Sequence, residues 1–266
     1  MKSARQNMVA LLLLFLFVSA KNTTIQHSKY QNRVFKVWSG EVKDSFIIYV
    51  SNFTNSAQKP TRAVYYLDAK LNSGYYVREE LAKLTHPDLN TWYIGIAHMG
   101  DYHVKRRRDF IPPKDGSGSG DPNFGHGETF YTYLTKKLIP LIEKKYQIKP
   151  RNHLVGHSLG GLFAVYALTK NESFFTTYYS LSPSIWINYY AIIKRIENQK
   201  AKYGSAKTLV LMNGNLEYYN KISQGNAVLR RTLSTHQKEL KLITRIYPLK
   251  GHNGYVKDAI KWIINQ

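Results

Sequence analysis

The residues around Ser158 have the spacing of a nucleophile elbow, in which a strand turns sharply into a helix. Apolar runs precede and follow the segment Gly156-His157-Ser158-Leu159-Gly160. Such a turn strains the backbone of its central residue, and glycines two positions before and after it remove side chains that would collide there. We therefore predict that the Ser158 hydroxyl is a nucleophile at the carboxyl edge of a sheet. The alternative is a glycine-rich turn that merely joins two packed elements.

A serine nucleophile needs a base, and the base needs an acid that holds its tautomer. In a fold with this elbow, the acid and then the histidine follow the serine along the chain. His252 lies in the loop between the last expected strand and the last expected helix, and Glu217 lies in the loop that leaves the strand at 208–212. These positions predict a triad of Ser158, Glu217 and His252. The alternative interpretation of Glu217 is a charge at a helix terminus.

Two N–H groups must also stabilise the oxyanion of the tetrahedral intermediate. The backbone amide of Leu159 directly follows the nucleophile at the start of a helix. The second donor normally comes from the loop after the third strand, here residues 67–72, and we assign it to the amide of Lys70.

The elements that position these residues alternate between short apolar runs and helical patterns. Two β-rich runs at 34–38 and 46–53 predict an antiparallel hairpin at the sheet edge. Continuous apolar runs predict strands buried on both faces at 63–67, 92–97, 153–155, 178–181, 208–212 and 243–247. Helices are expected at 130–146, with a kink at Pro140, and at 158–168, 185–203, 227–241 and 254–264. This order predicts the α/β-hydrolase fold, a mostly parallel sheet with helices on both faces.

The stretch 99–127 has no periodicity and contains Arg106-Arg107-Arg108. Because it follows the strand at 92–97, it should leave the sheet on the same side as Ser158. We expect a loop that covers the active site, with arginines that bind an anionic substrate. The alternative is a passive surface insertion.

The first twenty residues have the features of a secretory signal. Lys2 and Arg5 precede an apolar run at 8–18, which small residues follow. A retained membrane anchor is the alternative, but the run is too short to cross a bilayer. We expect a signal peptide at 1–20 and one domain at 21–266, periplasmic or secreted, with no stable membrane insertion after cleavage. The sequence has no cysteine, which suits an exported bacterial protein without disulfides.

The chain is strongly basic, with 38 Lys and Arg against 17 Asp and Glu, a net charge of +21. The cations are scattered, without a recognition helix or an aromatic stacking array. We therefore expect general association with anionic surfaces and no specific nucleic-acid binding. His98, Asp101 and His103 lie close in sequence but on an expected loop without second-shell partners, so we expect no metal and no cofactor.

Several further motifs occur in a fixed order. They are Leu67-Asp68-Ala69, Arg106-Arg107-Arg108-Asp109-Phe110-Ile111-Pro112, Leu138-Ile139-Pro140-Leu141-Ile142-Glu143-Lys144-Lys145-Tyr146, Gly156-His157-Ser158-Leu159-Gly160-Gly161, Ser182-Pro183-Ser184-Ile185-Trp186 and Gly214-Asn215-Leu216-Glu217. With them the chain, from about residue 34 onward, resembles the putative-esterase family of the α/β-hydrolases, and within it the ferric-siderophore (enterochelin-type) esterases.

The resemblance implies the same triad and the same two oxyanion amides. It implies a serine esterase that cleaves a small-molecule ester, siderophore-like or otherwise anionic, through an acyl-enzyme. Ala69 departs from the glycine usual in the family, and some relatives use a Ser-His dyad without Glu217. Trp186 either lines a pocket for the substrate or packs in the core. An acyltransferase and a non-catalytic binding protein are the alternative functions.

Overall fold

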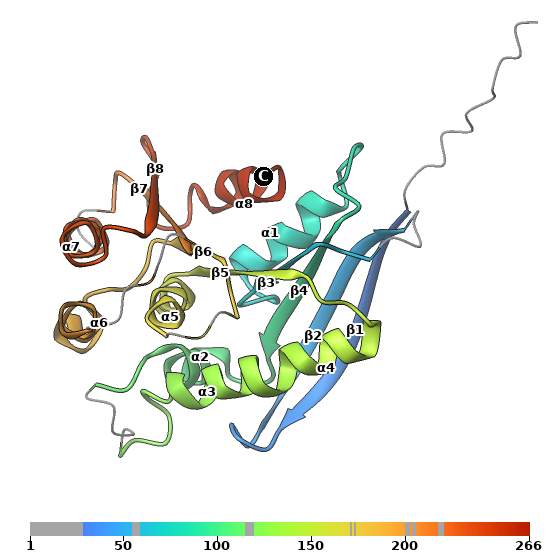
Figure 1. Cartoon of the computed structure of the whole chain (residues 1–266), viewed down its shortest axis with the longest axis horizontal. Coiled ribbons are helices and arrows are strands. Elements are labelled where there is room, and N and C mark those ends of the chain that lie inside the picture. The colour runs from blue at the N-terminus through green and yellow to red at the C-terminus, as the bar shows by residue number, and fades with distance from the viewer. Residues whose placement is uncertain are drawn as a thin grey trace, which may run out of the picture.

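The computed structural model describes residues 29–54, 59–114, 120–170, 172, 174–199, 203, 206–217 and 221–266. They form an eight-stranded sheet with helices on both faces (Figure 1). The expected signal peptide at 1–20 lies outside the described residues. Within the described part of the chain, no helix combines the length and the apolar character that a membrane span requires.

The sheet has the strand order β1-β2-β4-β3-β5-β6-β7-β8. Its strands are β1 (Lys29–Ser39), β2 (Asp44–Thr54), β3 (Arg62–Tyr66), β4 (Thr91–His98), β5 (Arg151–His157), β6 (Thr177–Leu181), β7 (Thr208–Gly214) and β8 (Lys241–Tyr247). The predicted hairpin at the sheet edge is confirmed, since β1 pairs antiparallel with β2, which in turn pairs antiparallel with β4. The remaining pairs are parallel, so β3 to β8 end at one edge of the sheet.

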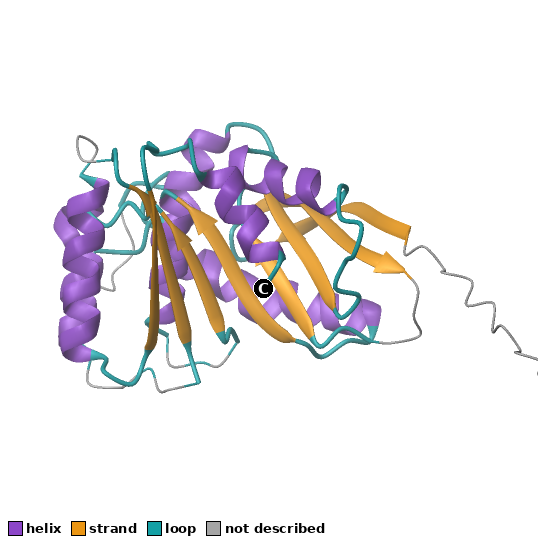
Figure 2. Ribbon diagram, turned by 90° about the horizontal axis from the view of Figure 1, so that it is seen from above, coloured by secondary structure: helices purple, strands orange, loops and turns teal. Residues whose placement is uncertain are grey.

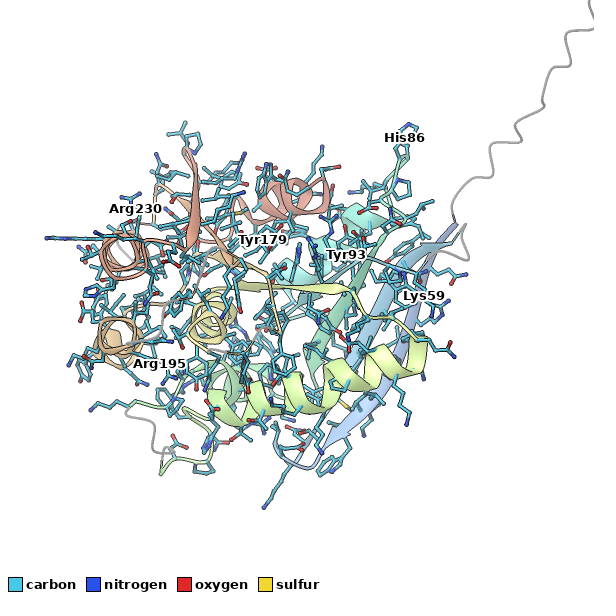
Figure 3. The ribbon with its side chains drawn as sticks, in the orientation of Figure 1. Lys59, His86, Tyr93, Tyr179, Arg195 and Arg230 are labelled. Carbon is cyan, nitrogen blue, oxygen red and sulfur yellow. The ribbon has the colours of Figure 1, made fainter. Side chains whose placement is uncertain are left out.

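Alternate side chains of each strand face opposite layers of helices. Tyr65 belongs to a large apolar cluster under α2 to α7, and Tyr66 to a smaller one under α1 and α8. The helices are α1 (Asn72–Leu81), α2 (Tyr102–Phe110), α3 (Gly127–Tyr133), α4 (Ile139–Tyr146), α5 (Leu159–Leu168), α6 (Ile187–Asn198), α7 (Ile222–His236) and α8 (Val256–Ile264). Figure 2 shows both layers flanking the twisted fan of strands. Tyr93 and Tyr179, labelled in Figure 3, face the α1 and α8 layer.

The helix expected at 130–146 contains a π-helical turn, Leu134–Leu138, between α3 and α4. In this turn the Ile139 N–H donates to the Leu134 carbonyl, five residues back. Pro140 then occupies the first turn of α4, where its missing N–H costs little. At the predicted kink, the helix has a wider π-helical turn before Pro140. α6 and α7 end before the predicted positions, and Lys241 begins β8 instead of ending a helix.

The prediction of an unstructured loop at 99–127 is wrong, because residues 102–110 form α2. Asp101 caps this helix by accepting hydrogen bonds from the backbone N–H groups of His103 (3.0 Å) and Val104 (3.3 Å). The helix fully buries just Asp109 and Phe110. It therefore lacks the apolar stripe on which helix prediction depends.

Candidate active site

Ser158 lies at the junction of β5 and α5 with φ 59° and ψ −113°, the strained conformation that a nucleophile elbow requires. A Cβ on Gly156 would approach the Gly160 carbonyl oxygen to 2.1 Å, so this position accepts glycine alone. A Cβ on Gly160 would meet nothing closer than 3.5 Å, whereas one on Gly161 would lie 2.8 Å from the Leu181 oxygen. The glycine needed after Ser158 is therefore Gly161, one residue later than we predicted.

Glu217 and His252 lie in the loops after β7 and β8 and contact each other, with 3.0 Å between Glu217 Oε2 and His252 Nδ1. Neighbouring parallel strands bring the two loops together, and the Leu216 N–H donates to the Lys250 carbonyl (3.0 Å). Glu217 is 1% exposed. A buried carboxylate beside Nδ1 holds the tautomer that leaves Nε2 free to accept a proton.

Ser158 and His252 line one cavity of about 240 Å³ at the carboxyl edge of the sheet. Their neighbours along its wall are Asp68, Leu71, Ser73, Tyr102, His103, Arg106, His157 and Asn253. The Ser158 hydroxyl lies 3.3 Å from the Ser184 hydroxyl, which is its hydrogen-bond partner here. The Ser184 N–H also donates to the Ser158 carbonyl (3.2 Å), so the loop after β6 is fixed directly beside the elbow.

His157, the residue before Ser158, supports the loop that carries His252. Its Nε2 lies 3.0 Å from the His252 carbonyl oxygen, and the two imidazole rings pack with 4.6 Å between centroids. Burial, together with the charges of His252 and Arg106, lowers the pKa of His157 from 6.5 to about 3. His157 therefore stays neutral at physiological pH and adds no positive charge next to His252.

The two amides predicted to bind an oxyanion belong to the start of α5 and to the turn after β3. Leu159 is the first residue of α5, where backbone N–H groups have no partner within the helix. Lys70 lies in the turn after β3 and lines an adjoining cavity of about 220 Å³. In this turn, the N–H groups of Ala69 and Leu71 donate to Ile96 (3.0 Å) and Asp68 (2.8 Å).

The left-handed residue of that turn is Asp68, with φ 57°. The alanine at position 69, where the family usually has glycine, therefore meets no left-handed backbone requirement. Arg106 anchors the turn, because its Nε donates to Asp68 Oδ1 (2.8 Å) and its Nη2 to the His157 carbonyl (3.3 Å). Arg106 thus connects the expected oxyanion turn to the elbow.

The arginine run does not form a flexible cationic loop, and each of its members has a separate environment on α2. Arg106 lines the Ser158 cavity. Arg108 donates to both carboxylate oxygens of buried Asp109 (2.7 and 2.8 Å) and to Asp44 (3.0 Å). Arg107 is exposed, with its guanidinium 5.4 Å from the centre of the Phe124 ring. Helix formation separates the three side chains because successive residues point about 100° apart.

Trp186 directly precedes α6 and is 38% exposed, so it is not a buried packing residue. The residues weighed as metal ligands also have separate roles. His98 Nε2 lies 2.9 Å from buried Asp109, Asp101 caps α2, and His103 lines the Ser158 cavity. Among the described residues, no cluster of three or more His, Cys, Asp or Glu could hold a metal ion.

Several buried residues that hold this site could not be assigned a role from the sequence. The Ser182 hydroxyl donates to Glu217 Oε1 (2.6 Å) and lies 2.6 Å from the Tyr255 hydroxyl. Asp68 receives Arg106, and Ser184 contacts Ser158. Ser182 and Ser184 belong to the Ser-Pro-Ser motif, which indicated the family but predicted no contact with the catalytic residues.

The strand order, the elbow and the His-Glu pair at one edge define the α/β-hydrolase fold. The chain belongs to the Putative esterase family, whose model matches residues 39–242. It is 34% identical over 139 residues to the ferri-bacillibactin esterase BesA of Bacillus subtilis, and the matched segment covers 48% of each chain. It is 31% identical over 144 residues to the siderophore enterobactin esterase of Emericella nidulans, covering 49% of this chain and 47% of that one. The chain thus spans about half the length of the curated relatives it matches.

Solved structures share the fold over most of this chain. The siderophore hydrolase EstB from Aspergillus nidulans has a TM-score of 0.70 at 18% identity, covering 88% of this chain and 94% of that one. The BES protein from Bacillus cereus has a TM-score of 0.69 at 21% identity, covering 99% and 97%. These likenesses confirm the predicted fold class.

Proposed function

We propose that this protein is a serine esterase that hydrolyses carboxylic esters through an acyl-enzyme on Ser158. The observation that carries the proposal is the contact between buried Glu217 and His252 at the cavity that Ser158 lines from a strained elbow. Membership in an esterase family supports the same activity.

In the proposed mechanism, His252 Nε2 takes the proton of the Ser158 hydroxyl as Oγ attacks the ester carbonyl. Glu217 holds the Nδ1 proton and stabilises the imidazolium that forms. The amides of Leu159 and Lys70 donate to the oxyanion. The tetrahedral intermediate collapses as His252 gives its proton to the leaving alcohol. A water, deprotonated by His252, then attacks the acyl-enzyme, and the acid is released as Ser158 regains its proton.

We infer that the substrate is a siderophore-like or other anionic ester. Two relatives are named as esterases of ferri-bacillibactin and enterobactin, and this chain carries a net charge of +21. A cavity of about 240 Å³ is small for such molecules, so part of the substrate would extend beyond it. A second cavity of about 570 Å³, along α6, is lined by Lys114, Lys194 and Arg195 and suits an anionic part. We further propose cleavage of a signal at 1–20 and a periplasmic or secreted location.

The test is ester hydrolysis by purified protein, with p-nitrophenyl acetate as a neutral ester and ferric enterobactin as an anionic one. Ser158→Ala and His252→Ala should each lower kcat by ~10³-fold or more, and Ser158→Ala should abolish labelling by a fluorophosphonate probe. Glu217→Gln should cost ~10²–10⁴-fold, because it orients the base and transfers no proton. Full activity of folded Ser158→Ala would contradict the proposal, and full activity of Glu217→Gln would indicate a Ser-His dyad.

A further inference from the structure

Glu217 is held by more than its contact with His252. Its Oε1 accepts hydrogen bonds from the Gly214 N–H (2.7 Å) and the Ser182 hydroxyl (2.6 Å), while Oε2 faces His252 Nδ1 (3.0 Å). A carboxylate has no proton to give, so all three partners are donors. The direction in which Oε2 points therefore depends on residues that do not line the Ser158 cavity.

Ser182 directly follows β6 and is fully buried. Its φ of 42° is in the left-handed region, where a residue other than glycine is strained. The backbone is held there in part by a hydrogen bond from the Ser182 N–H to the Met212 carbonyl on β7 (2.7 Å). Strained residues persist where the surroundings fix them, and they gather at functional sites. Here the strained backbone directs the Ser182 hydroxyl at Glu217.

Tyr255, at the start of α8, completes the arrangement. Its hydroxyl lies 2.6 Å from Ser182 Oγ and 3.1 Å from the Met212 carbonyl. Ser182 has one proton, which goes to Glu217, so Tyr255 is the donor in its contact with Ser182. Tyr255 also donates to the Met212 carbonyl, so its single proton is shared between Ser182 Oγ and that carbonyl. Burial raises the pKa of Tyr255 far above the working range, which keeps the phenol protonated and able to donate. The Tyr255 ring is fixed by stacking on Tyr247, with 4.9 Å between centroids.

We propose that Ser182 and Tyr255 are positioning residues that orient Glu217 toward His252 through a Tyr255-Ser182-Glu217 chain of hydrogen bonds. The proposal rests on the proposed esterase mechanism, in which His252 becomes an imidazolium in the transition state. Glu217 stabilises that charge only while Oε2 stays at Nδ1, and the bonds to Oε1 prevent the carboxylate from rotating. Because neither residue lines the substrate cavity, the chain should affect kcat and leave KM unchanged.

The molecule contains a matched control for this arrangement at the opposite edge of the sheet. In the β1–β2 hairpin, the Tyr30 hydroxyl donates to Ser51 Oγ (3.2 Å), which donates to Asn32 Oδ1 (3.0 Å). Ser51 is fully buried and pairs with Tyr93, near the beginning of β4. Ser51→Ala and Tyr30→Phe therefore delete hydrogen bonds of the same kind, a tyrosine to a serine and that serine to a side-chain oxygen, far from Glu217.

The test is the steady-state kinetics of Ser182→Ala and Tyr255→Phe, alone and combined with Glu217→Gln, on p-nitrophenyl acetate. Ser182→Ala should lower kcat about 10-fold and Tyr255→Phe about 5-fold, with KM within about twofold, because a bond to a charged group is lost or weakened. In the Glu217→Gln background, Ser182→Ala should cost less than about twofold. Ser51→Ala and Tyr30→Phe should leave kcat unchanged. If Ser182→Ala does not fold, Ser182→Gly removes the hydroxyl without strain at φ 42°.

A second measurement does not need turnover. The His252 Nδ1 proton, identified by its loss in His252→Ala, should resonate at low field in the proton NMR spectrum, and Ser182→Ala should shift it while Ser51→Ala should not. If the wild-type protein hydrolyses no ester but Ser182→Ala shifts the His252 Nδ1 resonance, the proposed function is wrong and the hydrogen-bond chain is supported. Wild-type kcat with an unmoved resonance in Ser182→Ala would overturn the chain. The chain would also be overturned if Ser182→Ala lowered kcat as much in the Glu217→Gln background as in the wild type.

Discussion

At the scale of single residues, His252 is fixed from two sides. Glu217 holds its Nδ1, and His157 bonds its backbone carbonyl and packs against its ring. Imidazole bases must hold one ring orientation through the reaction, since a misplaced base loses most of its effect on the barrier. His157, the residue before Ser158, therefore contributes to the orientation of the proposed base as well as to the elbow.

His157→Phe keeps the packing of an aromatic ring on His252 but removes the donor to its carbonyl. We expect kcat on a neutral ester to fall about 10-fold with little change in KM, because the loop of His252 loses an anchoring bond. Steady-state kinetics measure this. His86→Gln is the control, since His86 (labelled in Figure 3) is exposed on the loop that enters β4, at the opposite edge of the parallel strands from the site. Wild-type kcat in folded His157→Phe would show that the hydrogen bond does not support the base.

At the scale of secondary-structure elements, the charged residues of α2 have a structural role, because they attach this helix to the sheet. Arg108 and His98 both contact buried Asp109, which fixes α2 to β4, and Arg108 also reaches Asp44 at the start of β2. This attachment places Arg106 where it bonds Asp68 in the turn after β3 and the His157 carbonyl at the elbow. The arginines were expected on a loop and lie on a helix instead, where Arg106 and Arg108 bond buried acids; that they bind substrate stays a prediction.

Arg106→Gln leaves the carboxylate of Asp68, 4% exposed, without its cation. We expect a loss of about 3 kcal/mol in the free energy of unfolding and a loss of about 10-fold or more in kcat, equal for neutral and anionic esters. Urea denaturation and kinetics on both esters measure these effects, and exposed Arg107→Gln is the control. Arg106→Gln/Asp68→Asn should recover part of the stability. A loss confined to the anionic ester would instead identify Arg106 as a substrate-binding residue.

At the scale of the whole molecule, buried histidines make stability depend on pH. The pKa of His157 is lowered to about 3 by burial and neighbouring charge, and burial with Arg62 and Arg151 lowers that of His153 to about 4. Between these values and 6.5, the unfolded chain binds protons that the folded protein does not. The folded state therefore loses stability as pH falls below about 6.5.

We expect His157 alone to lower the free energy of unfolding by about 1.2 kcal/mol as the pH falls from about 6 to 5. Urea denaturation at pH 7, 6 and 5 measures this, in a range where most carboxylates stay ionised. His157→Phe should have a shallower dependence than wild type. Equal slopes for the two proteins would mean that His157 is protonated in the folded state.

The net charge of +21 is also a property of the whole molecule. Basic residues such as Lys59 and Arg230 lie at opposite ends of it (Figure 3). We expect kcat/KM for an anionic ester to fall several-fold as the salt concentration rises from about 0.02 to 0.5 M, because salt screens long-range attraction. A neutral ester should show no such dependence. If kcat/KM for the anionic ester does not change with salt, the net charge does not attract the substrate.

The sequence by itself determined the strands, the elbow and the position of the candidate triad. Continuous apolar runs such as 208–212 are local signals of buried strands, and the glycines around Ser158 are required by the backbone of one turn. Parallel strands end at the same edge of the sheet, so the loops after β7 and β8 lie together, and Glu217 and His252 could be predicted from these loops. The helix α2 could not, because just two of its residues are fully buried.

Tertiary structure alone decided which partners these residues have. Arg106 and Asp68 are 38 positions apart, and Ser182 and Tyr255 are 73 apart. Neither pair has a signature in local composition, since the contact exists only once strands from distant segments lie side by side. The same reason explains why the contacts by which Arg106 and Arg108 hold a helix and a turn could not be predicted from the arginine run. Local patterns predict where the chain turns, and packing between distant segments determines what each side chain touches.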